Sequence, residues 1–143
     1  MIIGADEQIA PTPDAIEAVL EFLPVFEDPH FLPEVVVAEE KGWIFEQYSR
    51  EVYEFEKTLY RAGFIVRFDW ARWEPVALRF FREPGRLDAA DMSILRRLLT
   101  FHIRKNVACE GHLAEMLRAG HVQAILRRLE TLSSGGAEMA GTA

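Results

Sequence analysis

The feature that most constrains how this chain can fold is a long stripe of helical period in its second half. An α-helix starting near Asp88 would place the members of the stripe along one side, because they follow one another at steps of three or four residues. The members are Met92, Leu95, Leu99, His102, Asn106, Glu110, Leu113 and Leu117. Apart from three polar residues, this side is apolar and needs other elements to cover it. We therefore predict a mainly α fold of packed helices.

Helical period and end signals predict three further helices. The first begins at Thr12, which can cap it, and has Pro13 at its first position. The second covers residues 50–62, between a cap at Ser49 and a stop at Gly63. The last has a regular apolar face made of Val122, Ile125, Leu126, Leu129 and Leu132.

Another helix follows Phe68, and its start is ambiguous in the sequence. Asp69 is a candidate cap, and Phe68 and Trp73 can form the apolar pair that staples the chain around it. Pro75 would remove a hydrogen bond inside such a helix. The helix is therefore either kinked or begins near Glu74.

Residues 35–48 allow two interpretations. Pro33 can open a short helix that is followed by an irregular segment, and we favour this interpretation. In the alternative, the β-branched run at residues 35–37 pairs with residues 43–48 as a β-hairpin. The alternative adds a short extended or hairpin segment to an otherwise helical domain.

Length and composition fit one compact domain. Of the 143 residues, 50% are hydrophobic, which is enough to build a core. We predict a flexible leader at residues 1–11, a single domain of about five helices at 12–132, and a disordered tail at 133–143. No apolar run approaches the roughly 20 residues of a membrane-spanning helix. Because Cys109 is the single cysteine, no intrachain disulfide can form, and we expect a cytoplasmic location.

Charge is distributed unevenly along the chain. The net charge is −7, but residues 1–71 hold 15 acidic and 5 basic side chains, whereas residues 72–143 hold 8 and 11. The basic half is not dense enough for a typical nucleic-acid interface, so we do not expect a nucleic-acid partner. The charges are interpreted as a solvated surface.

The polar residues within the stripe are the main candidates for a binding site. His102, Asn106 and Glu110 would stack on successive turns of a helix face that is apolar above and below them. A buried carboxylate at Glu110 would need a partner or a raised pKa. The candidate ligand-binding residues are Asp69, Trp70, Trp73, His102, Arg104, Asn106 and Glu110. Two structural alternatives are a satisfied polar network and a helix break at Asn106 that moves Glu110 elsewhere.

No metal site or cofactor is expected. Cys109, Glu110 and His112, with His102 in reach, lack the paired ligands typical of zinc sites. Cys109 is interpreted as a small buried thiol rather than a nucleophile. The tryptophans are most simply core or rim packing, although Trp70 and Trp73 could wall a ligand site.

Several short motifs together resemble domain of unknown function 6508, a group of small bacterial proteins. The resemblance covers most of residues 16–132. The motifs are Phe68-Asp69-Trp70 with Trp73, Leu98-Leu99-Thr100 with Arg104, Cys109-Glu110-Gly111-His112-Leu113, Gly120, and Ile125-Leu126-Arg127-Arg128-Leu129. The family has no established activity, so the resemblance implies a fold and no particular reaction.

Two classes of function remain open. We favour a non-enzymatic protein-interaction or regulatory module, because no complete catalytic set is visible, with another protein or a second copy as its partner. The alternative is a small-molecule-binding protein or enzyme with a polar pocket. This pocket would lie near Asp69, Trp70, Trp73, His102, Arg104 and Glu110. No membrane partner is expected.

Overall fold

The computed structural model describes residues 9–142, without the side chains of residues 37–40, 44–46 and 136–142. The described part is mainly helical, which confirms the predicted fold class, but it has seven α-helices rather than about five. The α-helices are α2 (Pro13–Leu20), α3 (Phe22–Glu27), α4 (Arg50–Arg61), α5 (Glu74–Arg82), α6 (Met92–Ala108), α7 (His112–Arg118) and α8 (His121–Thr142). The other elements are a 3₁₀ helix, η1 (Pro84–Ala89), and two strands, β1 (Glu34–Glu40) and β2 (Trp43–Tyr48).

The two additional helices arise where predicted helices divide. The first helix divides at Glu21, because Pro24 has no N–H group to continue the hydrogen-bond ladder. The long stripe divides after α6, where Gly111 has a φ of 93°, which favours glycine. Glu110 therefore lies in a loop and not on the face of α6.

Local signals predict the starts of α2 and α4 correctly, but the start predicted near Asp88 is wrong, because residues 84–89 form η1 and α6 begins at Met92. The Ala15 N–H donates to Thr12 Oγ1 at 3.1 Å, and the Ile94 N–H donates to Asp91 Oδ1 at 2.9 Å, so both side chains are caps. Ser49 precedes α4 as expected but makes no side-chain capping bond. Asp69 is not the cap of α5, which begins at Glu74 because Pro75 is accommodated only in the first turn.

The hairpin interpretation of residues 35–48 is correct and the favoured helix is wrong. β1 and β2 pair antiparallel, with Glu40 opposite Trp43 at the turn and a bulge between Val36 and Ala38. The two turn residues, Lys41 and Gly42, have φ values of 53° and 82°, as a two-residue hairpin turn with the favoured twist requires. The turn lacks the usual Asn-Gly signal, which explains why the helix could compete in the sequence.

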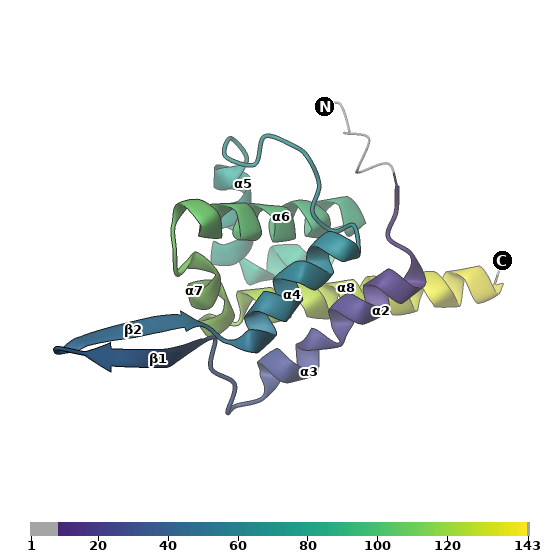
Figure 1. Ribbon diagram of the computed structural model, residues 1–143. Helices are drawn as coiled ribbons and strands as arrows, with labels where there is room; N and C mark the ends of the chain where they lie inside the picture. Colours follow the sequence, from purple (N-terminus) through teal and green to yellow (C-terminus); the bar gives the residue numbers. More distant parts are fainter. Residues whose placement is uncertain (1–8, 143) are drawn as a thin grey trace.

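Helices α6 and α8 organise the core. α8 contacts α2, α3, α6, α7 and η1, and Figure 1 shows it running across the helical body behind α4 and α2. All nine residues from Leu95 to Ile103 of α6 are buried. The predicted stripe therefore marks only one side of a helix that is covered on every side over its middle.

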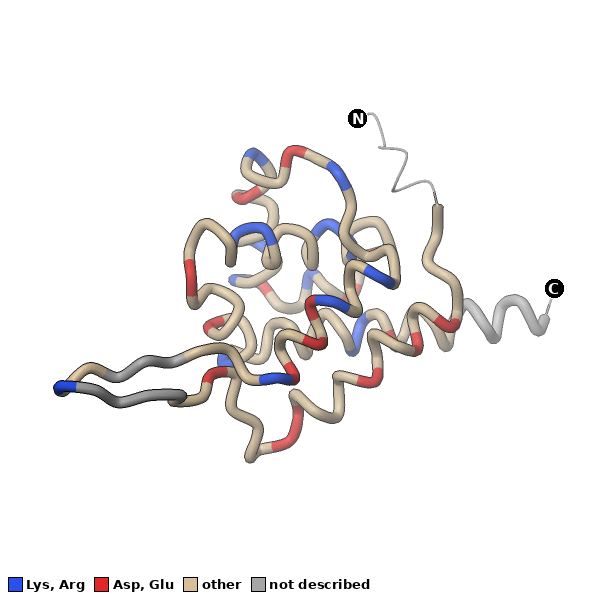
Figure 2. Tube along the Cα trace, in the orientation of Figure 1, with Lys and Arg blue, Asp and Glu red and all other residues tan. Residues whose placement is uncertain are grey.

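Ion pairs join the acidic first half of the chain to the basic second half. Arg118 Nη2 lies 2.8 Å from Glu34 Oε1, and Arg127 pairs with Glu27. Figure 2 shows acidic residues spaced along α2, α3 and α4, and basic residues recurring along α6. Some of the acidic residues of the first half are thus neutralised by basic residues of the second half.

The two ends of the chain relate differently to their predicted boundaries. Residues 1–8 of the predicted leader lie outside the described residues. At the other end, α8 continues as helix to Thr142, through the segment where the sequence predicts a disordered tail. Among the described residues, no helix combines the length and apolar character that crossing a bilayer requires.

Candidate functional site

Three buried histidines meet where α6, α7 and α8 converge. His102, His112 and His121 are 1%, 8% and 5% exposed. His102 Nδ1 and His112 Nε2 lie 2.9 Å apart, and the two rings stack with centroids separated by 5.2 Å. The His121 ring meets the His102 ring edge to face at 4.9 Å. We call these three residues the histidine cluster.

Two glycines bring the second and third histidines to the first. His112 and His121 are the first residues of α7 and α8, and each directly follows a glycine, Gly111 or Gly120. Both glycines have φ values in the left-handed region, 93° and 78°, where the chain turns sharply between helices. The sequence did not lead us to predict that His121 belongs to this cluster, nor that His102 and His112 are hydrogen-bonded. The repeated Gly-His pair was the signal that could have found them.

Aromatic rings enclose the histidine cluster. Phe101 contacts the rings of His102 and His112, with centroids 5.2 and 6.1 Å away, and it also contacts the Trp70 ring at 6.1 Å. Phe81 meets His121 edge to face at 5.3 Å. The rings of His102 and His121 are therefore largely removed from water, a setting that penalises charged imidazolium.

Burial lowers the pKa of each histidine in the cluster. The pKa of His121 falls to about 4 through burial and the neighbouring His112. Burial also places the pKa of His102 well below its ordinary value of 6.5, with further lowering from His121, His112 and Lys105. His112 shifts in the same direction through burial and Lys105, opposed by Glu115 and Glu74. All three rings are therefore neutral at pH 7.

Neutral rings define what the cluster can do. A neutral imidazole has one donor and one acceptor, so the His102–His112 contact is a single hydrogen bond. The Nε2 atoms of His102 and His121 are buried without a hydrogen-bond partner in the described part of the chain. Among those residues, no group of three or more His, Cys, Asp or Glu side chains is arranged to hold a metal ion. The described cluster is a packed, proton-sensitive element of the core.

Asn106 joins three elements beside the histidine cluster. Its Oδ1 atom accepts a hydrogen bond from the Tyr48 hydroxyl at 2.5 Å and another from the Leu113 N–H at 3.0 Å. The second bond satisfies an N–H group in the first turn of α7, which has no partner within its own helix. Asn106 therefore caps the next helix from a distance, although the helix break lies later, at residues 109–111.

Replacing Asn106 is expected to destabilise the fold. Asn106→Ala removes the acceptor of two hydrogen bonds, so the free energy of unfolding should fall by about 1–2 kcal/mol in urea titrations. Glu110→Ala is the matched control, because Glu110 is a nearby exposed residue. Its expected effect is within about 0.5 kcal/mol. Equal effects of the two substitutions would contradict this role of Asn106.

The burial predicted for Glu110 and Cys109 is wrong. Both residues are exposed in the loop after α6, because the helix ends before the stripe reaches them. They line a groove of about 300 Å³ together with Gly111, His112, Glu115, Arg118 and Glu34. Glu110 therefore needs no buried partner.

The other candidate residues occupy separate places. His102 lies in the core, and Asp69 is exposed in the loop before α5. Trp73 packs against Phe68, with ring centroids 5.6 Å apart, so the predicted contact forms although Asp69 does not cap α5. Trp70 and Arg104 line a different pocket of about 400 Å³. The described structure does not bring the seven predicted residues into one cavity.

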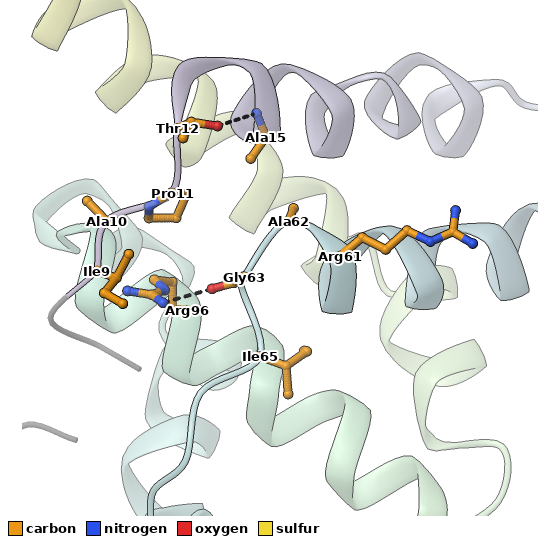
Figure 3. Close-up of a pocket in the computed structure, with 10 residues that line it drawn as sticks. All are labelled: Ile9, Ala10, Pro11, Thr12, Ala15, Arg61, Ala62, Gly63, Ile65 and Arg96. Carbon is orange, nitrogen blue, oxygen red and sulfur yellow. Dashed lines mark hydrogen bonds between the residues drawn. The ribbon is translucent and has the colours of Figure 1, made fainter. Parts of the chain in front are cut away.

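A further pocket, of about 390 Å³, lies where the chain enters α2. Figure 3 shows Arg96 donating to the Gly63 carbonyl, at 2.7 Å, next to Ile9 and Pro11. The bond ties the end of α4 to the buried part of α6.

Comparison with protein families matches residues 11–135 to the family of unknown function DUF6508. The chain belongs to this family. The match confirms the resemblance found in the sequence, and it includes the hairpin, Asn106 and the whole histidine cluster of this DUF6508 chain. No match was found among curated proteins or solved structures.

Proposed function

We propose that the chain is a protein-interaction module that binds a second copy of itself through the β1–β2 hairpin. The observation that carries the proposal is that the hairpin forms a sheet of its own, away from the helical body. Figure 1 shows it projecting from the helical body beside α7, and its sheet has only two strands. An isolated two-stranded hairpin is at best marginally stable in water, so an added strand would stabilise it.

The hairpin is anchored to the body at its base. The Ser49 N–H donates to the Pro33 carbonyl at 2.9 Å, Glu34 pairs with Arg118, and Tyr48 donates to Asn106. These contacts hold the base in place and leave the outer part extended into solvent. A rigid base with an extended arm suits recognition by strand addition.

Exposed apolar side chains favour a protein partner for this arm. Trp43 next to the turn is 72% exposed and Val36 is 60% exposed. Large exposed aromatic residues on an open strand edge are typical of interfaces and not of solvated surfaces.

Charge indicates β2 as the pairing edge. The sequence of β1 contains three glutamates in seven residues, whereas that of β2 contains one in six and is rich in aromatic and β-branched residues. Two β1 strands would bring acidic residues together, and like charges opposed across a ladder are destabilising. Two antiparallel β2 strands related by a twofold axis would instead place Trp43 opposite Tyr48.

The test is the oligomeric state of the full chain. Sedimentation velocity over a concentration series should show a dimer for the wild type. Trp43→Glu should raise the dimer dissociation constant about 30-fold, which corresponds to the roughly 2 kcal/mol of an interfacial aromatic anchor.

A matched control separates the hairpin from general surface effects. Tyr60 is an exposed aromatic residue on α4, so Tyr60→Glu should leave the dimer unchanged. Thermal unfolding should show that both variants keep the helical body folded. A wild type that is monomeric at every concentration, or equal effects of the two substitutions, would overturn the proposal.

A further inference from the structure

We infer that the pocket lined by Trp70 and Arg104 binds a small aromatic carboxylate. The pocket measures about 400 Å³, within the range of small-molecule sites. Its lining residues are Val66, Arg67, Phe68, Trp70, Arg104, Val107 and Ala108. The inference is independent of the proposed dimer, because none of these residues lies in the hairpin.

Charge complementarity indicates an anionic ligand. None of the seven lining residues is acidic, although the chain carries a net charge of −7, and Arg104 supplies a guanidinium at the pocket. The Arg104 guanidinium is exposed and forms no ion pair with any residue of the described range 9–142. A guanidinium offers parallel N–H donors that match the two oxygens of a carboxylate.

The walls of the pocket indicate an aromatic body for this anion. Trp70 offers a large flat ring, and Val107 at the pocket is 76% exposed, so both present apolar surface to a ligand. A flat apolar ligand would cover both side chains and remove apolar surface from water.

The aromatic walls are held in place from behind, so the pocket is largely pre-formed. Trp70 packs edge to face against the buried ring of Phe101. Phe68 is supported by Trp73 and by the Arg97 guanidinium, which lies 4.8 Å from the ring centroid. A pre-formed site loses little conformational entropy when a ligand binds.

Isothermal titration calorimetry with 2-naphthoate and its neutral amide, 2-naphthamide, tests the inference. Full-length protein should bind one 2-naphthoate per chain, and Arg104→Gln should weaken this binding about tenfold while leaving 2-naphthamide unaffected. Trp70→Leu should weaken both probes, because the ring contacts the shared aromatic body.

Two controls make the outcome decisive. Arg72→Gln removes an exposed arginine that does not line the pocket, so it should bind 2-naphthoate as the wild type does. Trp43→Glu should also keep full binding, which separates this site from the proposed dimer. The inference is overturned by absence of saturable 2-naphthoate binding, by equal affinity of wild type and Arg104→Gln, or by equal effects of the Arg104 and Arg72 substitutions.

Discussion

Acidification from about pH 7.5 to about pH 5 is expected to lower the free energy of unfolding by about 2 kcal/mol through His121 alone. The pKa of His121 is about 4 in the folded chain, because the ring is buried beside His112. The unfolded chain has the ordinary histidine pKa of about 6.5. His102 adds to the loss, since burial lowers its pKa in the same direction.

The direction of this effect follows from proton binding. Between about pH 6.5 and about pH 4 the unfolded chain binds a proton at His121 and the folded chain does not, so acid favours unfolding. The contribution of neutral His121 to the free energy of unfolding is therefore fully present above about pH 6.5, and it declines as the pH falls towards about 4. Urea unfolding measured at several pH values gives the change directly.

Single substitutions isolate the contribution of the histidine cluster. In His121→Gln the loss of stability between the two pH values should be smaller than in the wild type by about 2 kcal/mol. His30→Gln is the control, because His30 is exposed and is the one histidine outside the cluster. If both substitutions leave the pH dependence unchanged, His121 is not held neutral in the folded chain.

Replacing Thr100 by valine is expected to lower the free energy of unfolding by about 2–6 kcal/mol. The Thr100 hydroxyl is buried on α6, where it accepts a hydrogen bond from the Val66 N–H at 3.0 Å and donates one to the Phe64 carbonyl at 3.3 Å. Valine has nearly the same shape but neither hydrogen-bonding group. Two backbone groups would then be buried without partners, at a cost of about 1–3 kcal/mol each.

Serine at position 100 provides the matched control. Thr100→Ser keeps the hydroxyl and removes one methyl group, so the expected loss is about 1 kcal/mol. Urea unfolding of the three proteins at pH 7.5 orders them as wild type, serine and valine. A valine variant as stable as the serine variant would show that the hydroxyl does not hold the backbone of Phe64 and Val66 in place.

The sequence predicts contacts between residues that lie within a few positions of one another. The cap at Thr12 satisfies an N–H group three residues away, and the predicted contact between Phe68 and Trp73 closes over a similarly short distance. Each such contact depends on neighbours in the chain, so residue type and spacing are enough to predict it.

The hairpin shows where local signals fail to decide. The run at residues 35–37 favours a strand, but Pro33 also suits a helix start, and Lys41-Gly42 is a less usual turn than Asn-Gly. The local signals for a strand and for a helix are of similar strength here. Whether residues 35–37 form a strand therefore depended on their pairing with β2. The antiparallel register decides it in the structure.

The sequence by itself determined the helical class, the starts of α2 and α4, and a polar stripe containing His102 and Asn106. Tertiary structure alone decided their partners. His102 meets His112 and His121 because two glycines turn the chain between three helices, and Glu110 is exposed because α6 ends before the stripe does. The physical reason is that helical period specifies which residues share a face only while the helix continues. Contacts between helices depend on where each one ends and how it packs.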